Sequence, residues 1–142
     1  MAKAHSKDTF LQIEDAGGAL RIVTPNVTSV DGLPGERELV EITALGDSAR
    51  SYAPGLTNTT FTVEGYWDET ANTGTDTVLG VLYNHTAALS VVYGPEGNDT
   101  GDVQYNVECF CRSYTITSRM GEIVTFRAEF QSNAAVTRTI KS

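Results

Sequence analysis

The feature that most constrains this chain is a succession of short segments in which apolar and polar residues alternate, separated by Gly, Asn, Asp and Pro. In the segment 59–67, Phe61, Val63 and Trp67 share one face of an extended chain and polar residues share the other. The pattern predicts antiparallel β structure with one packed and one polar face. Strands are expected at about 9–14, 19–23, 27–30, 36–43, 59–67, 87–93, 102–118 and 122–131.

Residues 75–84 are the one segment with a helical pattern. Thr75 is a candidate N-cap and Asp76 lies in the positive first turn, while Val78 stacks over Leu82 four residues later. A lone helix of this length is not stable in water. We therefore expect its apolar stripe to cover the open side of a sheet or barrel.

The long strand expected at 102–118 changes its apolar phase part of the way along. The first phase runs from Val103 to Cys109, and a second one begins at Phe110. The switch predicts a bulge or a change of sheet near 109–112. A disulfide between Cys109 and Cys111, two apart on the same face of a strand, would close a very tight loop, so buried reduced thiols are expected.

Residues 44–56 show no regular period and contain Gly46, Pro54 and Gly55, so we expect a long loop between two strands. Long loops in compact domains are usually functional or disordered. This one carries Leu45, Tyr52 and other apolar groups that a solvated loop does not need, and these would suit a contact with another molecule. A loop folded back on its own domain is the alternative.

The length of 142 residues fits a single domain, 1–142, that can bury a core without metals or disulfides. We find no apolar run long enough to cross a bilayer and no secretory signal, so we expect a soluble protein with no membrane partner that begins in a cytoplasm. The formal net charge of -8 argues against a protein that grips nucleic acid. The same charge suits a surface that DNA passes without sticking, although solubility alone is the plainer explanation.

No set of residues has the spacing of a catalytic, metal or cofactor site. The two histidines, His5 and His85, lack a neighbouring Ser or Cys at nucleophile spacing, and the acidic turn at 99–102 misses the register of a calcium loop. We therefore expect a protein that is not an enzyme and needs no cofactor. Asn-x-Ser/Thr sequences are compatible with a secreted immunoglobulin-like binding module, a more distant alternative. They begin at Asn26, Asn58, Asn84 and Asn98.

The segments 41–56 and 61–65, together with 15–18, 91–95, 124–131 and 134–138, resemble the siphophage major tail proteins, which form tail tubes. The resemblance spans most of the chain. It implies a mainly β fold, a β-sandwich or partly open barrel with one flanking α-helix, of the Hcp-like tail-tube type. It also implies a structural subunit that forms stacked six-membered rings around a channel for DNA. Tube proteins of contractile or type VI-like injection systems share this architecture and are the nearest alternative.

The resemblance further implies that a loop at about 44–57 contacts an adjacent ring and that extended terminal segments add contacts. The side chains predicted for this inter-ring contact are Leu45, Asp47, Arg50, Tyr52, Pro54 and Leu56. Acidic residues on the polar faces of the inner strands are predicted to line the channel and repel DNA. These are Glu36, Glu38, Glu41, Glu64 and Glu108. The assignment depends on strand register, because a slip of one residue exchanges the two faces.

The partners implied by the resemblance are further copies of the chain, a tape-measure protein, and tail-tip and tail-terminator proteins. DNA would pass through the lumen without specific binding. The expected location is the tail of a virion, after assembly in the cytoplasm of a bacterial host.

Overall fold

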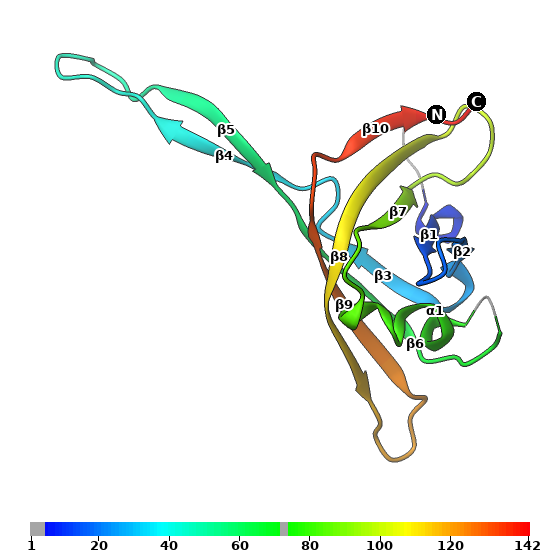
Figure 1. Cartoon of the computed structure of the whole chain (residues 1–142). Coiled ribbons are helices and arrows are strands. Elements are labelled where there is room, and N and C mark those ends of the chain that lie inside the picture. The colour runs from blue at the N-terminus through cyan, green and yellow to red at the C-terminus, as the bar shows by residue number, and fades with distance from the viewer. Residues whose placement is uncertain (1–4, 72–73) are drawn as a thin grey trace.

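The computed structural model describes residues 5–71 and 74–142, and these form a mainly β body with one long projection (Figure 1). The strands are β1 (Phe10–Glu14), β2 (Leu20–Ile22), β3 (Val27–Asp31), β4 (Glu36–Glu41), β5 (Tyr52–Asn58), β6 (Thr60–Tyr66), β7 (Leu89–Gly94), β8 (Val103–Thr117), β9 (Thr125–Ser132) and β10 (Thr137–Ile140). Helix α1 (Thr75–Leu79) and 3₁₀ helices at Ser6–Asp8, Thr24–Asn26 and Leu82–Asn84 complete the described elements. The prediction of a mainly β protein with one α-helix is confirmed.

One curled antiparallel sheet forms the body, in the order β2-β1-β7-β8-β9-β6-β3, with β10 added to β8. Strand β8 is shared by the two halves of this sheet. Its first part pairs with β7 and β10, and its second part, from Cys109 to Thr117, pairs with β9. The halves therefore curve around a common interior. The path ends at β2 and β3, which are not hydrogen-bonded neighbours, so the sheet stays open there.

Side chains from both halves of the sheet fill a single core, because alternate residues of each strand point inward. Phe61 on β6 and Phe130 on β9 stack with their ring centroids 4.9 Å apart. Val78, Leu79 and Leu82, from α1 and the 3₁₀ helix after it, are buried in the same cluster. The helix thus contributes its apolar side to the core of the sheet, as the sequence predicted.

The bulge predicted in the long strand is confirmed, since the pairing of β8 with β9 shifts register between Cys111 and Ser113. Cys109 and Cys111 are free thiols on the buried face of this strand. Burial raises the pKa of the Cys109 thiol to about 12 and that of the Cys111 thiol to about 11. Both thiols are therefore protonated at neutral pH and act as small apolar side chains, as expected.

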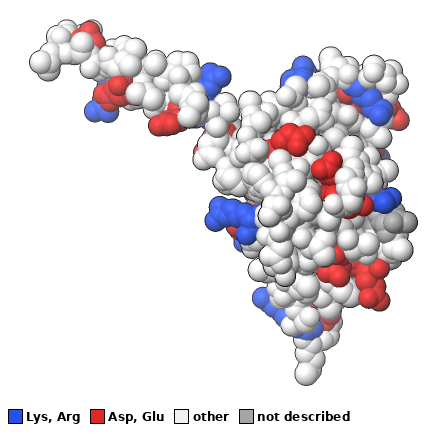
Figure 2. All heavy atoms as spheres, in the orientation of Figure 1, with Lys and Arg blue, Asp and Glu red and all other residues white. Residues whose placement is uncertain are grey.

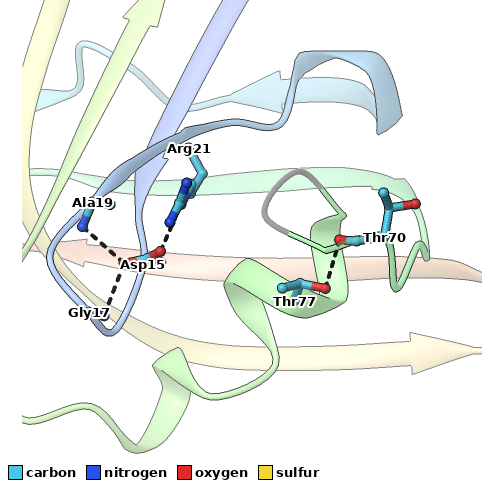
Figure 3. Close-up of polar contacts among 6 residues, drawn as sticks. All are labelled: Asp15, Gly17, Ala19, Arg21, Thr70 and Thr77. Carbon is cyan, nitrogen blue, oxygen red and sulfur yellow. Dashed lines mark hydrogen bonds and ion pairs between the residues drawn. The ribbon is translucent and has the colours of Figure 1, made fainter.

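The turn between β1 and β2 is held by the carboxylate of Asp15 (Figure 3). Its Oδ1 accepts hydrogen bonds from the backbone N–H groups of Gly17 at 3.0 Å and Ala19 at 2.9 Å. Its Oδ2 accepts a bond from Arg21 Nε at 2.9 Å. The Arg21 side chain is the largest cause of a lowered pKa for Asp15, followed by the Ala19 N–H. One carboxylate thereby ties both ends of the hairpin turn together.

The helix is shorter than predicted, and its predicted N-cap is wrong. α1 ends at Leu79, and Gly74 is the N-cap residue. Thr75 is instead buried in the first turn, where its hydroxyl donates to the Tyr66 carbonyl at 2.7 Å and accepts from the Asp68 N–H at 3.1 Å. The hydroxyl is thus used to attach the helix to β6 rather than to cap it. The Thr77 hydroxyl adds a bond to the Thr70 carbonyl at 2.9 Å (Figure 3).

Two strand predictions also need correction. The expected loop at 44–56 is a loop only at 42–51, because Tyr52–Asn58 form β5 and pair with β4. The strand expected at 36–43 ends at Glu41. In addition, Thr137–Ile140 form β10, a strand that the alternation pattern did not reveal.

Candidate assembly interface

Residues 36–58, comprising β4, the loop 42–51 and β5, form a two-stranded projection that we call the arm. The arm extends away from the body (Figure 1), and β4 and β5 make up a separate sheet of two strands. None of its residues is buried, and all of β4 is exposed. A two-stranded hairpin without a core is marginally stable in water. The arm therefore has the form of an element that is completed by another molecule.

Both faces of the arm carry apolar side chains. Cross-strand partners share a face, so Leu39 lies with Pro54 on one face and Val40 lies with Ala53 on the other. The arm as a whole exposes six large hydrophobic side chains: Leu39, Val40, Ile42, Leu45, Tyr52 and Leu56. Exposed apolar surface on both sides of a thin element marks an interaction site rather than a solvated loop.

All six residues predicted for the inter-ring contact lie on the arm, in two different settings. Leu45, Asp47 and Arg50 are in the loop, and Tyr52, Pro54 and Leu56 are in β5. Leu45 is fully exposed, at 106% of its reference area. The sequence prediction missed the apolar residues of β4, although the adjacent pair Leu39 and Val40 in an otherwise acidic strand was a signal that could have found them.

The end of the arm is ordered by its own polar groups. Asp47 Oδ2 accepts a hydrogen bond from the Ala44 N–H at 2.7 Å, and the Ser51 N–H donates to Thr43 Oγ1 at 2.8 Å. Arg50 lies 3.9 Å from Glu41, an exposed ion pair that adds little stability. These contacts order the loop, while Leu45 within it stays fully exposed.

The arm leaves the body at Thr59, a residue that is only 3% exposed. Its hydroxyl donates to the Pro34 carbonyl at 3.3 Å, and its N–H donates to Ser132 Oγ at 3.0 Å. The Ser132 N–H in turn donates to the Thr59 carbonyl at 2.8 Å. Gly35, with φ of +113°, lies so close to Thr59 that a Cβ there would overlap its side chain. The base of the arm is therefore fixed to β9 while the rest projects freely.

The five acidic residues predicted to line a channel do not share one surface. Glu36, Glu38 and Glu41 are on the arm, and strand alternation puts Glu41 on the opposite face of β4 from the other two. Glu64 and Glu108 are on the polar face of the main sheet, where Glu64 lies 3.6 Å from Arg127 and Glu108 accepts a bond from the Ser90 hydroxyl. The five residues therefore lie on two separate sheets, and their position along a channel stays a prediction.

A second projection is the turn that joins β8 to β9, which we call the tip hairpin and define as residues 112–127. It extends from the body on the side away from the arm (Figure 1). Met120 is 102% exposed and Ile123 is 70% exposed, and Ile116 is exposed as well. A shallow hollow of about 320 Å³ lies beside it, lined in part by Arg119, Ile123 and Phe126. The sequence prediction missed this surface. The one signal in the sequence was a large apolar residue, Met120, in the turn between the two long strands.

Further hollows lie elsewhere on the body, one of them at the base of the arm, lined in part by Pro34, Thr59 and Val136. A groove of about 450 Å³ between β1, β3 and β7 is lined mainly by Thr, Val and Leu, with Lys7 and Tyr93 at its sides. Within residues 5–71 and 74–142, no group of three or more His, Cys, Asp or Glu side chains is placed to hold a metal ion. No helix in the same part of the chain has the length and hydropathy needed to span a membrane.

Comparison with solved structures identifies the fold. A chain from the tail of an empty gene transfer agent particle with C6 symmetry superposes with a TM-score of 0.73 at 12% identity, covering 96% of this chain and 99% of that one. The SPP1 tail tube gives a TM-score of 0.75 at 12% identity, covering 98% of this chain and 80% of that one. A chain of the sheath–tube complex of the PVC extracellular contractile injection system gives 0.70 at 15% identity, covering 98% and 93%.

No protein-family profile and no curated protein sequence matches the chain. At such low identities the likeness concerns the fold, which extends over nearly the whole chain in each comparison. The fold that the sequence resemblance implied is confirmed: the chain has the Hcp-like tail-tube fold, found in phage tails and contractile injection systems.

Proposed function

We propose that this protein is a structural subunit of a phage tail tube, assembling into rings that stack around a channel for DNA. The observation that carries the proposal is the arm, a two-stranded projection with apolar groups on both faces and no buried residue of its own. In a monomer these groups lie in water. In a stack of rings the arm would bury them against a neighbour, which supplies the third and later strands or side chains that a hairpin needs.

The fold supports the same proposal, because chains of similar fold come from the tail of a gene transfer agent, the SPP1 tail tube and a contractile injection system. The domain would be one tube domain, with the arm serving as the inter-ring element. Its six predicted contact residues, from Leu45 to Leu56, would meet the next ring. The partners would be other copies of the chain, with tape-measure, tail-tip and terminator proteins at the ends, inside a virion tail built in the host cytoplasm.

The channel assignment is narrower than the sequence prediction. Glu108, on the polar face of the main sheet, is proposed to line the lumen and keep DNA from adhering. Glu64, beside Arg127 in the hollow at the tip hairpin, is proposed to serve contacts between rings. Glu36, Glu38 and Glu41 are proposed to serve contacts between rings instead, because they lie on the arm. A structural role without catalysis is proposed because chains of similar fold come from phage-type tails and tail tubes.

A tube protein of a contractile injection system is the second candidate, favoured by the similarity to the PVC sheath–tube complex at a TM-score of 0.70. The two differ in what surrounds the tube. A contractile system requires a sheath protein encoded nearby, and a siphophage tail lacks one. The secreted immunoglobulin-like module is no longer supported, because the chain has the tail-tube fold along nearly its whole length.

Negative-stain electron microscopy of the purified protein at rising concentration tests the proposal. The wild type is expected to form hollow tubes or stacked rings. An armless variant replaces residues 38–56 by Asn-Gly, which joins the cross-strand partners Arg37 and Thr57 through a two-residue turn. This variant is expected to keep its β-sheet circular dichroism and to stop at single rings or monomers.

Two controls make the result specific. Val81→Ser removes an exposed apolar side chain from the body and should leave assembly intact. Wild-type protein that stays monomeric at every concentration, and also when tail-tip proteins are added, would overturn the tube proposal. If the armless protein stacks as well as the wild type, the arm is not the element that joins the rings.

A further inference from the structure

We propose that the acceptor of the arm is the hollow beside the tip hairpin of a second copy of this chain, located in the next ring. The inference rests on the proposed tube function and adds to it the surface that the arm meets. Leu45 enters the hollow next to Ile123 and Phe126, while Asp47 faces Arg119. The contact joins two different surfaces of the same protein, so each subunit donates one arm and accepts another.

The placement of the two projections is the first argument. The arm and the tip hairpin extend from the body on different sides (Figure 1), so the arm does not reach the tip of its own chain. A contact between unlike surfaces is heterologous and does not close in a pair. Repeated between copies along one direction it produces a continuous stack, which is the arrangement that a tube requires.

The size of the hollow and the apolar groups at the two surfaces are the second argument. Leu45 at the end of the arm is fully exposed, and nothing in its own chain covers it. The hollow has a volume of about 320 Å³, several times that of a leucine side chain, and Ile123 and Phe126 supply apolar surface among its mainly polar lining residues. Met120, next to Arg119 in the sequence, is fully exposed, and its flexible side chain adapts readily to an irregular partner.

Charge is the third argument. Residues 36–58 of the arm contain four carboxylates and two arginines, a net charge of 2 − 4 = −2. Residues 112–127 of the tip hairpin contain three arginines and one glutamate, a net charge of 3 − 1 = +2, in a protein whose total is -8. Glu64 of β6 also lines the hollow, where Arg127 lies 3.6 Å from it. Along the arm, groups of both signs are spread over a thin surface (Figure 2). Opposite local charges favour this pairing over the acidic remainder of the body.

The individual groups agree with the local charges. Asp47 uses one carboxylate oxygen, Oδ2, for the Ala44 N–H, and the other oxygen has no partner among the described residues. Arg119 lines the hollow and forms no ion pair with any side chain of residues 5–71 and 74–142. Arg138 and Lys141 make the C-terminal segment basic too, but β10 lies at the end of the body opposite the tip hairpin (Figure 1).

A charge exchange tests the pairing. Asp47→Arg and Arg119→Asp are each expected to raise the protein concentration needed for tube formation severalfold, since each puts like charges in contact. The double variant restores the opposite charges in reversed order and should assemble near the wild-type concentration. Arg138→Asp, an equal change of charge on the other side of the body, should behave as the wild type. Light scattering measures assembly, and circular dichroism verifies that each variant folds.

The outcomes separate this inference from the proposed function. If the wild-type protein never forms tubes, the proposed tube function itself is wrong, whatever the variants do. Wild-type tubes with a double variant as defective as the worse single variant would overturn the pairing of Asp47 with Arg119 and leave the tube intact. An Asp47→Arg variant that assembles normally would overturn it as well.

Cross-linking gives an independent readout. A chain carrying both Leu45→Cys and Ile123→Cys, oxidised after tube formation, is expected to give a ladder of covalent multimers on a denaturing gel. Each single variant should remain monomeric, and so should a chain with Leu45→Cys and Val81→Cys. The natural thiols do not interfere, because Cys109 and Cys111 are buried. A ladder from the Val81 pair, or none from the Ile123 pair in intact tubes, would refute the proposed acceptor.

Discussion

At the scale of single residues, Thr59 determines how the arm is attached. Its side chain is almost completely buried, and its hydroxyl, N–H and carbonyl bond to Pro34 and Ser132 from two different segments. Buried polar groups that lose a partner keep the cost of desolvation. The attachment is therefore sensitive to the loss of one oxygen atom even though little apolar area is involved.

Thr59→Val tests this attachment. Replacing the hydroxyl by a methyl leaves the Pro34 carbonyl without its donor, and we expect the free energy of unfolding to fall by about 1 kcal/mol. Urea denaturation of the monomer measures the difference. Thr57→Val, two residues away on the exposed arm, is the matched control and should change stability little. Equal effects from the two variants would contradict the role of the buried hydroxyl.

The ion pair of Asp15 and Arg21 predicts a pH dependence. The folded-state pKa of Asp15 is lowered, chiefly by the Arg21 side chain, so its contribution to stability is present above the unfolded pKa of about 3.9 and is lost as the pH falls through the folded pKa. Arg21→Gln should therefore be less stable than the wild type at pH 7, by less than about 1 kcal/mol because both groups are partly solvated.

The difference between the wild type and Arg21→Gln should shrink below pH 4, where Asp15 becomes protonated in both proteins. Urea denaturation at several pH values measures it. Arg138→Gln, which removes an exposed arginine outside any described ion pair, should show no such dependence. A difference that persists unchanged at low pH would show that Arg21 acts through packing of its aliphatic stem.

Individual buried positions were largely predictable from the sequence. The alternation of Phe126, Ala128 and Phe130 is local, and the structure buries all three. The roles of Thr59 and Thr75 were not predictable, because their hydroxyls bond to residues that only the complete fold brings near. A pattern read along the chain indicates which face is apolar, whereas a buried polar group depends on partners elsewhere in the sequence.

At the scale of elements, the arm shows why one strand was missed. Tyr52–Asn58 contains Pro54 and Gly55, residues that disfavour a central strand, and it pairs with β4 through a register shift. β5 is an edge strand in which both residues are tolerated, so its identity depends on β4. β10 was missed for a similar reason, since its four residues form a strand only by pairing with β8.

Hydrogen exchange measures the dependence of the arm on its partner. Backbone amides of β4 and β5 are bonded only within an exposed two-stranded sheet, so they should exchange rapidly in the monomer. In assembled tubes they should become protected. Amides of β6 and β9, inside the main sheet, should be protected in both states and serve as the internal reference. Arm amides that are already as slow as these in the monomer would contradict the expectation.

At the scale of the whole molecule, the distribution of charge bears on how DNA would pass. The polar face of the sheet presents Glu108, which is exposed and bonded to Ser90. If this face lines the channel, symmetry repeats the carboxylate in every ring, and the summed field repels phosphate. One substitution at this position therefore changes the charge of every subunit along the tube.

Glu108→Lys tubes are therefore expected to retain a short fluorescent DNA, and to release it as salt is added, whereas wild-type tubes retain none. Co-sedimentation of tubes with the DNA measures retention. Glu69→Lys, an exposed carboxylate in the connection before α1, is the control and should behave as the wild type. If only the Glu69 variant retains DNA, or if neither variant does, Glu108 does not line the channel.

The line of the arm has a mechanical consequence. β4 follows β3 after a short turn and β5 leads directly into β6, so the arm extends the direction of these two strands (Figure 1). A pull on the arm is then directed along β6, which pairs with β9 at seven positions from Thr60 to Tyr66. Because bonds between strands lie across the strand axis, such a pull loads them together in shear instead of peeling them apart one by one. A filament linked through these arms would therefore resist stretching.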